Sequence, residues 1–272
     1  MGNSFTREHI RSINPYEPII PLDVLSKKLG IPIGKLIKLD ANENPYGMPP
    51  SSKRRLANLS FGHVYPDPES RFLREALSKY FEVPSENILL GAGADELIDL
   101  ILRLTMEPGQ KMINCPPTFG FYDVAAQVND LQTMEVARKS DFSLDLAGIE
   151  RAVSEGAKLI FLANPNNPDG GVIPSELLEE ILALPILIVL DEAYIEFAKP
   201  YKGWIPEVLH RDNLVVLRTF SKWGGLAGLR LGYGVFPRFL AGEMMKIKPP
   251  YNVSVTASEA GLGALEDIWL LH

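Results

Sequence analysis

Short apolar runs alternate with amphipathic segments between residues 88 and 217 of this 272-residue chain. The runs have the length and composition of buried strands, and the intervening segments space apolar residues as helices do, for example from Leu97 to Leu104. Strands that alternate with helices predict an α/β fold, a mostly parallel sheet with helices on both faces. The predicted strands are 88–90, 112–113, 159–163, 186–190 and 214–217.

The region before residue 88 has a different pattern. Residues 1–38 are rich in proline and mixed charge, which predicts an arm with at most one short helix near Leu22–Leu29. Residues 70–81 again place apolar residues at helical spacing and are predicted to form a helix. Two polar stretches with tyrosine, 39–47 and 64–68, are predicted loops; such loops often line sites, although solvated loops are commoner.

Composition excludes several classes of function. Hydrophobic residues make up 46% and charged residues 22%, as in ordinary globular proteins, and the net charge of −7 argues against a nucleic-acid surface. The four histidines are too scattered for a metal site, and the single cysteine, Cys115, indicates a reducing compartment. No apolar run is long enough for a membrane span. We expect no metal, no nucleic-acid or membrane partner, and a cytoplasmic protein, or a plastid one if a transit peptide is missing.

The unusual loops all follow predicted strands. In parallel sheets, ligands gather beyond the carboxyl ends of the strands, so five such loops on one rim predict a site. The turn Gly91–Glu96 lies between a strand and a helix and could hold a phosphate on its amides, although an acidic helix start is also common without a ligand. It is not a dinucleotide fingerprint, because Glu96 occupies the position of the third glycine.

Asp191 follows the apolar run 186–190 directly. An unpaired carboxylate at the end of a buried strand costs several kcal/mol, so it needs a cationic partner. That partner is either an arginine of the protein or a protonated ring nitrogen of a cofactor. A nucleoside triphosphatase is rejected, because the only Gly-Lys pair, Gly34-Lys35, is followed by Leu36 and lacks the earlier glycine of a phosphate loop.

Two further loops offer an amide and an amine. Pro168 biases Asn167 toward an extended backbone, so the Asn167 side chain can be aimed with little entropy loss; a plain turn is the alternative. Residues 219–234 hold Gly224, Gly225 and Gly228, too many glycines for a helix, and are predicted to be a tight loop in close approach to another group. Partial desolvation of Lys222 in that loop would lower its pKa and make it a Schiff-base nucleophile; an ordinary basic surface loop is the alternative.

An amine, a buried carboxylate, a phosphate cradle, an aromatic ring and amide donors are the parts that hold pyridoxal phosphate as an electron sink. The motifs that supply them occur in the order LDANENPYG, YPDP, GAGADE, PPTFGFY, NPNNPDG, DEAYIEF and TFSKWGGLAGLRLGYG. By this order and spacing the chain resembles, from about Pro15 to about Glu266, the histidinol-phosphate aminotransferases, a family of class II, fold-type I pyridoxal-phosphate enzymes.

The resemblance implies a role for each residue of the site. Lys222 would bind the cofactor covalently and then move a proton between the substrate α-carbon and the cofactor, while Asp191 would keep the pyridine nitrogen protonated. Tyr65 would reach the phosphate of the neighbouring subunit, which implies a homodimer. The other implied cofactor contacts are Phe119, Asn167 and Tyr194 on the ring, and Ala94, Asp95, Thr219, Ser221 and Arg230 on the phosphate.

The implied reaction is amino transfer from L-histidinol phosphate to 2-oxoglutarate, which gives imidazole-acetol phosphate and glutamate in histidine biosynthesis. Similar enzymes act on aromatic amino acids or decarboxylate a phosphorylated threonine, and these remain alternatives. The second hypothesis is a catalytically silent subunit or fragment. A plain nucleotide-binding α/β domain is the third.

The same resemblance suggests how the chain is divided. We expect an N-terminal arm at 1–44, a large cofactor domain at 45–250, and the beginning of a small domain at 251–272. Family members continue beyond this length and supply an arginine for the acidic group of the substrate, so we expect a C-terminally truncated form. The apolar residues between Leu262 and Leu271 then predict an apolar surface with no following element to bury it.

Overall fold

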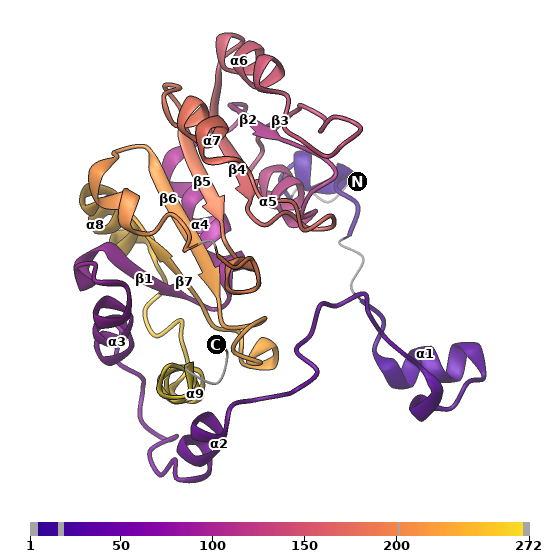
Figure 1. The fold of residues 1–272 in the computed structure, drawn as a ribbon, viewed down its shortest axis with the longest axis vertical. Helices are drawn as coiled ribbons and strands as arrows, with labels where there is room; N and C mark the ends of the chain where they lie inside the picture. The colour runs from indigo at the N-terminus through magenta and orange to yellow at the C-terminus, as the bar shows by residue number, and fades with distance from the viewer. Residues whose placement is uncertain (1–4, 16–18, 201, 269–272) are drawn as a thin grey trace.

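The computed structural model describes residues 5–15, 19–200 and 202–268. Its centre is a sheet with the strand order β1-β7-β6-β5-β4-β2-β3, seven strands within the described residues (Figure 1). The strands are β1 (Ile88–Gly91), β2 (Lys111–Asn114), β3 (Gln132–Glu135), β4 (Ala157–Ala163), β5 (Leu187–Asp191), β6 (Leu214–Thr219) and β7 (Gly232–Val235).

The sheet is mostly parallel, which confirms the predicted fold class. Neighbouring strands from β6 to β3 run parallel, and β7 pairs antiparallel with both β6 and β1. The carboxyl ends of β1, β4, β5 and β6 therefore meet at one edge of the sheet. The unusual loops leave from that edge.

Two strands, β3 and β7, were not predicted from the sequence. The prediction of a continuous loop at 219–234 is wrong at its end, because β7 forms there. Tyr233 and Val235 are buried in the core, but the alternate positions are glycines, so no apolar run marks the strand. A side chain at Gly232 would stand 2.3 Å from the backbone nitrogen of Ala94, so this glycine lets α4 approach the sheet. β3 is an edge strand with no buried residue and therefore lacks an apolar signal.

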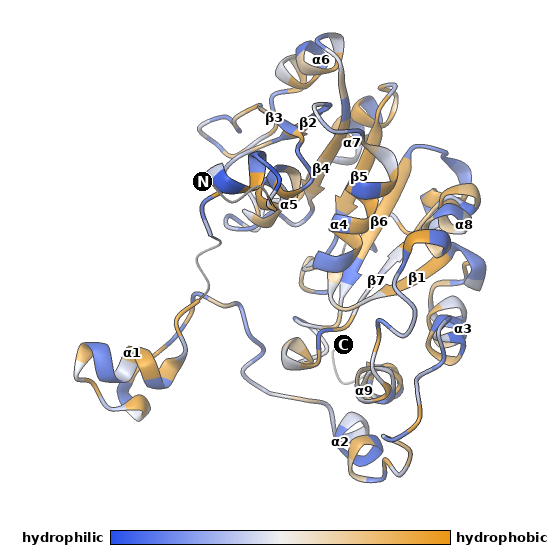
Figure 2. Cartoon of the chain, turned by 180° about the vertical axis from the view of Figure 1, so that it is seen from behind, coloured by the Kyte–Doolittle hydropathy of each residue, from blue (hydrophilic) through white to orange (hydrophobic). Residues whose placement is uncertain are grey.

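Helices cover both faces of the sheet. Val189 and Leu217 pack with α4, α5 and α8 on one face, whereas Ile188 and Val216 pack with α3, α6, α7 and α9 on the other. Figure 2 shows apolar central strands between these layers. The helices in the described part of the chain are α1 (Leu22–Leu29), α2 (Pro50–Ala57), α3 (Arg71–Phe81), α4 (Ala94–Thr105), α5 (Phe121–Val128), α6 (Leu146–Ser154), α7 (Ser175–Leu182), α8 (Arg238–Ile247) and α9 (Val255–Glu266).

The predicted helix of the arm, α1, lies apart from the body and buries none of its residues (Figure 1). Beyond it the chain returns as an extended segment in which Ile37 and Leu39 are 86% and 80% exposed. Large apolar side chains exposed along one segment mark an interaction surface. The arm therefore offers apolar surface that the described chain does not cover.

α2 packs against α9, which brings residues from either end of the chain together (Figure 1). The hydroxyl of Ser51 donates to Asp267 at 2.7 Å, and Arg55 pairs with Glu259 and Glu266. The division at residues 44 and 250 stays a prediction. α2 falls on the large-domain side of that division, although its contacts are with α9.

The prediction of an unburied apolar C-terminal surface is wrong for Leu262, Leu265 and Ile268. These side chains are partly buried and pack against the core cluster. The reason is that α9 packs on the core of the described chain, with α2 against another part of it. Trp269, Leu270 and Leu271 lie outside the described residues.

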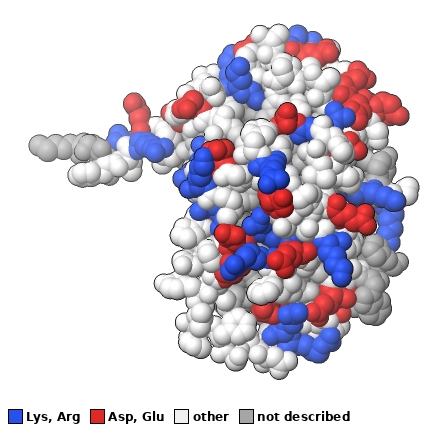
Figure 3. Space-filling model, turned by 90° about the vertical axis from the view of Figure 1, so that its left-hand side faces the viewer, with Lys and Arg blue, Asp and Glu red and all other residues white. Residues whose placement is uncertain are grey.

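Within the described ranges, the helices are too short or too polar for any of them to cross a membrane. The same residues contain no group of three or more His, Cys, Asp or Glu side chains that could hold a metal ion. On the face shown in Figure 3, basic and acidic side chains are interspersed. That face has no single-sign field of the kind that attracts nucleic acid.

Candidate active site

A cavity of about 260 Å³ lies at the carboxyl edge of the sheet. Its walls come from the ends of β4, β5 and β6, the start of α4 and the loops around them. Ten of the eleven predicted site residues line it: Ala94, Asp95, Phe119, Asn167, Asp191, Tyr194, Thr219, Ser221, Lys222 and Arg230. Residues 94 to 230 of the sequence thus converge on one small volume, which the fold brings together through parallel strand order.

Asp191 is a buried carboxylate, 5% exposed, that faces this cavity. It accepts a hydrogen bond from the Tyr122 hydroxyl at 2.7 Å and another from the Ala193 amide at 3.1 Å. Burial raises its pKa to about 6. Asp191 makes no ion pair with any described residue, so the predicted arginine partner is absent from this part of the chain. The carboxylate remains available to a cation in the cavity.

Tyr122 was not among the predicted site residues. Its ring is fully buried and stacks on Phe161, with 4.9 Å between ring centres, and its hydroxyl points to Asp191. The only sequence signal was its place in the PPTFGFY motif, at the start of a helix, where an aromatic residue commonly belongs to the core. Ala163, Ala193 and Ala227 also line the cavity, and their small side chains leave no chemical signal.

Lys222 reaches into the cavity from the turn that follows β6. Its amine donates to the carbonyl of Ala41 at 3.1 Å. Burial lowers the pKa of this amine; Arg230 lowers it further, whereas the carboxylates of Asp95 and Glu43 oppose the shift. The predicted partial desolvation is confirmed. An amine with a depressed pKa is more often neutral and therefore more nucleophilic.

The first residues of α4 and Arg230 form the edge of the cavity where an anion would fit. Gly93 precedes the helix with φ +85°, and a side chain there would stand 2.5 Å from the Arg230 guanidinium. Arg230 forms an ion pair with Asp95 at 2.6 Å, with both side chains about half exposed. The amides of Ala94 and Asp95 belong to the first turn of α4, where backbone donors lack helical partners.

Thr219 and Ser221 stand beside this helix start. The Thr219 hydroxyl donates to the Ser221 hydroxyl at 2.9 Å, and the Ser221 amide donates back to Thr219 at 3.1 Å. Both side chains are buried and line the cavity. They therefore add hydroxyl groups to the same anion-binding edge.

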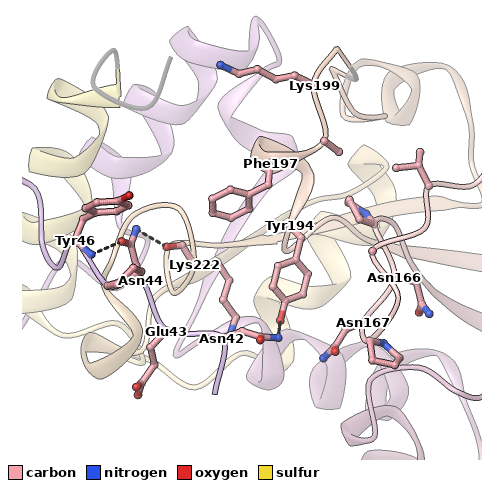
Figure 4. Close-up of a pocket in the computed structure, with 16 residues that line it drawn as sticks. Asn42, Glu43, Asn44, Tyr46, Asn166, Asn167, Tyr194, Phe197, Lys199 and Lys222 are labelled. Carbon is pink, nitrogen blue, oxygen red and sulfur yellow. Dashed lines mark hydrogen bonds between the residues drawn. The ribbon is translucent and has the colours of Figure 1, made fainter. Parts of the chain in front are cut away.

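Phe119, Asn167 and Tyr194 line another part of the cavity wall. Phe119 meets Tyr122 edge to face, with ring centres 5.4 Å apart. The Tyr194 hydroxyl accepts a hydrogen bond from the Asn42 amide at 3.0 Å, as Figure 4 shows. Among the described residues its own proton has no acceptor, so it can serve a ligand.

The loop that carries Asn167 is fixed by its neighbour Asn166, which is 2% exposed. The Asn166 amide nitrogen donates to the carbonyl of Pro117 at 3.1 Å, and its oxygen accepts from the Thr118 hydroxyl at 2.8 Å. The NPNNPDG and PPTFGFY motifs are thereby held against each other. Asn167 itself remains directed at the cavity.

A second, larger cavity of about 840 Å³ adjoins the first (Figure 4). The two share Glu43, Asn167, Tyr194 and Lys222. The larger cavity also contains Asn42, Tyr46 and Phe197, so the amine of Lys222 stands between a narrow chamber and a wide entrance. A substrate could reach the amine from this side.

Tyr65 is the predicted site residue that the cavity does not include. It is 79% exposed and stacks on Tyr251, with 4.7 Å between ring centres. Its proposed contact lies in a neighbouring subunit. That role stays a prediction.

Three comparisons connect this geometry with known proteins. A family model described as aminotransferase class I and II matches residues 34–270. Histidinol-phosphate aminotransferase 1, chloroplastic, of Arabidopsis thaliana is 51% identical over 270 residues, which cover 98% of this chain and 64% of the relative. Histidinol-phosphate aminotransferase of Roseiflexus castenholzii is 47% identical and covers 96% of this chain and 72% of that relative. The chain therefore spans about two thirds of the length of its plant relative.

A solved structure has the same arrangement of elements. The crystal structure of histidinol-phosphate aminotransferase from Sinorhizobium meliloti, in complex with pyridoxal-5'-phosphate, superposes with a TM-score of 0.89. The two sequences are 30% identical, and the match covers 99% of this chain and 73% of the other. The predicted fold, that of fold-type I pyridoxal-phosphate enzymes, is thereby confirmed.

Proposed function

Because the chain belongs to the aminotransferase class I and II family, we propose that it binds pyridoxal phosphate and transfers an amino group from L-histidinol phosphate to 2-oxoglutarate. The products would be imidazole-acetol phosphate and glutamate, in histidine biosynthesis. The observation that carries the proposal is that the amine of Lys222 and the unpaired carboxylate of Asp191 face one cavity. The names of the similar proteins support this substrate.

The residues of the cavity fit the cofactor at three points. Asp191 is buried and makes no ion pair with any residue that the structure describes, and a protonated pyridine nitrogen would supply the cation. The start of α4, Arg230 and two hydroxyl groups suit a phosphate. Phe119 provides an apolar ring face, and Tyr194 retains a free hydroxyl proton for a ring oxygen.

When bound, pyridoxal phosphate supplies an electron sink that makes the α-carbon of an amino substrate acidic. Lys222 would hold the cofactor and then carry the proton between substrate and cofactor, a task that its lowered pKa favours. Asp191 would hold a proton on the ring nitrogen. Asn167 and Tyr194, which line the cavity, would orient the ring.

The test is the visible absorption spectrum of the chain loaded with pyridoxal phosphate, recorded with and without L-histidinol phosphate. We expect a band of lysine-bound cofactor that is absent from Lys222→Ala and that substrate converts to the pyridoxamine form. Subsequent 2-oxoglutarate should restore the original band. Absence of the band would refute the cofactor assignment.

The same experiment separates the alternatives. If aromatic amino acids convert the band but L-histidinol phosphate does not, the substrate is an aromatic amino acid. If phosphothreonine loses carbon dioxide, the reaction is a decarboxylation. A band that no substrate alters would identify a catalytically silent chain. Tight binding of NAD or ATP without any band would support the nucleotide-binding hypothesis.

We further propose a homodimer, supported by the exposed apolar arm and by Tyr65 at the surface. Sedimentation should give twice the 30.1 kDa chain mass. The cytoplasm is the proposed compartment, with a plastid as the alternative, since the plant relative is named chloroplastic. Fractionation of cells that express the tagged protein would decide between them.

A further inference from the structure

The polar motif at residues 41–47, here called the clamp segment, crosses the turn that carries Lys222 (Figure 4). The Asn44 amide nitrogen donates to two consecutive backbone carbonyls, that of Lys222 at 3.0 Å and that of Trp223 at 3.1 Å. The Asn44 side-chain oxygen accepts from the Tyr46 amide at 3.0 Å. Both ends of this amide are therefore used, and its orientation is fixed.

The clamp segment and the lysine turn also meet directly, backbone against backbone. Gly225 has φ +60°, and a side chain there would stand 2.2 Å from the carbonyl oxygen of Gly47. Only glycine fits this position, both for its backbone conformation and for its space. The prediction of close approach in the glycine-rich loop is confirmed at Gly225, whereas Gly228 has open space around it.

The clamp segment also contacts functional groups in the cavity. The carbonyl of Ala41 accepts the hydrogen bond of the Lys222 amine, and the Asn42 amide donates to Tyr194. The clamp segment thus makes hydrogen bonds with the Lys222 carbonyl, the Lys222 amine and the Tyr194 hydroxyl.

We propose that Asn44 is a positioning residue for Lys222. By holding two successive carbonyls, it fixes the turn so that the lysine amine stays inside the cavity and out of bulk water. This inference rests on the proposed role of Lys222. It adds a reason why a polar loop far from that lysine in sequence belongs to the site.

Loss of Asn44 should rehydrate the amine. Burial is the first cause of the lowered pKa of Lys222, so a loosened turn should move that pKa up toward the ordinary lysine value. The charged groups that act on the amine are Asp95, Glu43, Arg230 and Asp191. All four remain in an Asn44→Ala variant, so the shift would report hydration and position.

The chain offers a matched control in Asn213. Its amide nitrogen donates to the carbonyls of Leu182, Leu184 and Ile186 at 3.0, 3.2 and 3.2 Å. It is half-buried like Asn44 but precedes β6, so it lies at the end of that strand away from Lys222. Both asparagines hold backbone carbonyls, and only one of them holds the lysine turn.

The experiment is competitive acetylation of the cofactor-free chain across a pH series, with the modification of Lys222 quantified by peptide mass spectrometry. For Asn44→Ala, which adds no charge beside the lysine turn, we expect the titration of Lys222 to move to higher pH. Its reactivity near pH 8 should fall about threefold to tenfold, since one pKa unit changes the neutral fraction about tenfold. For Asn213→Ala we expect a lower Tm with an unchanged Lys222 titration.

An Asn44→Ala variant that loses stability like Asn213→Ala but keeps the wild-type titration of Lys222 would overturn the inference. In that case Asn44 would only stabilise the fold. The labelling needs no cofactor. Failure of the proposed function would instead appear as a missing cofactor band in the wild-type chain, so the two failures are distinguishable.

Discussion

Asp191 and Glu192 are consecutive buried carboxylates with opposite surroundings. Successive side chains at a strand end point to opposite faces of the sheet, so Asp191 turns toward α5 and Glu192 toward the other layer. Asp191 faces the cavity and makes no ion pair among the described residues. Glu192 is fully buried and pairs with Arg218 at 2.7 Å.

The two sides differ in how completely their charges are satisfied. The Glu192 carboxylate accepts from Arg218 twice, at 2.7 and 2.9 Å, and from the Trp204 amide at 2.7 Å. Arg218 also lies 3.6 Å from Glu196 and over the Phe81 ring. A charge supplied with partners by its own chain serves the fold, whereas a charge left without a cation is available to a ligand.

The largest expected loss of stability comes from removing Arg218, the cation that pairs with Glu192. Arg218→Met would leave the buried Glu192 and the partly buried Glu196 without the cation that compensates them. We expect a loss of about 3–5 kcal/mol in the free energy of unfolding, measured in urea. The loss should be smaller at pH 5 than at pH 8, because the uncompensated carboxylates take up protons as the pH falls.

Arg211→Met provides the matched control, because Arg211 pairs with Glu179 nearer the surface. Such exposed pairs contribute about 0–1 kcal/mol. If the two variants lose equal stability, the cluster around Arg218 has no special structural role.

The second substitution, Asp191→Asn, should raise the free energy of unfolding instead of lowering it. With its pKa raised by burial to about 6 from 3.8, Asp191 destabilises the cofactor-free chain once it ionises. Its stability contribution is present below about pH 4 and is lost as the pH rises through about 6. Asp191→Asn should therefore increase the free energy of unfolding at pH 8 by up to about 3 kcal/mol, since two pKa units correspond to that amount.

The same variant should bind pyridoxal phosphate more weakly, because a protonated ring nitrogen would lose its carboxylate partner. The measurement is urea unfolding of both cofactor-free proteins at pH 4 and pH 8. An Asp191→Asn variant less stable than wild type at pH 8 would show that the carboxylate is satisfied within the chain, and the contrast with Glu192 would disappear.

The sequence identifies one half of this contrast. An apolar run that ends in Asp191 predicts a costly charge, and Lys222 among glycines predicts a desolvated amine, because both signals are local. The partner of Glu192 has no local signal. Arg218 is 26 residues away on β6, and only the pairing of Asp191 with Leu217 in the sheet brings it alongside.

Tyr122 and β7 were missed for similar reasons. An aromatic residue at the start of an amphipathic helix usually belongs to the core, and nothing near it in sequence indicates that its hydroxyl meets Asp191. In β7, glycines occupy one face because α4 approaches there, which erases the apolar alternation. Sequence therefore predicts elements and chemical groups better than it predicts which groups meet.

The third prediction compares the loss of one buried tyrosine hydroxyl on each face of the sheet. Tyr122→Phe removes the donor that stabilises the charged form of Asp191, so the pKa of Asp191 should rise further, by roughly one to two units. Tyr233→Phe removes an equally buried hydroxyl from the face of Arg218 and should leave Asp191 unchanged. Carbon-13 NMR of labelled aspartate, assigned with Asp191→Asn, gives both values. Equal shifts in the two variants would contradict the separation.

The smallest effect concerns the ion pair of Arg230 and Asp95 at the cavity edge. It is paired like Glu192, but it faces the cavity like Asp191. Arg230 and Asp95 are about half exposed, so Asp95→Asn should change the free energy of unfolding by no more than about 1 kcal/mol. The backbone amide of residue 95 remains, while the guanidinium loses its competing carboxylate. Inorganic phosphate should therefore bind the variant more tightly than wild type, by isothermal titration calorimetry, with Glu107→Gln as a control distant from the cavity. If phosphate affinity is unchanged although the Arg230–Asp95 ion pair is broken, Arg230 does not contribute to the anion-binding edge.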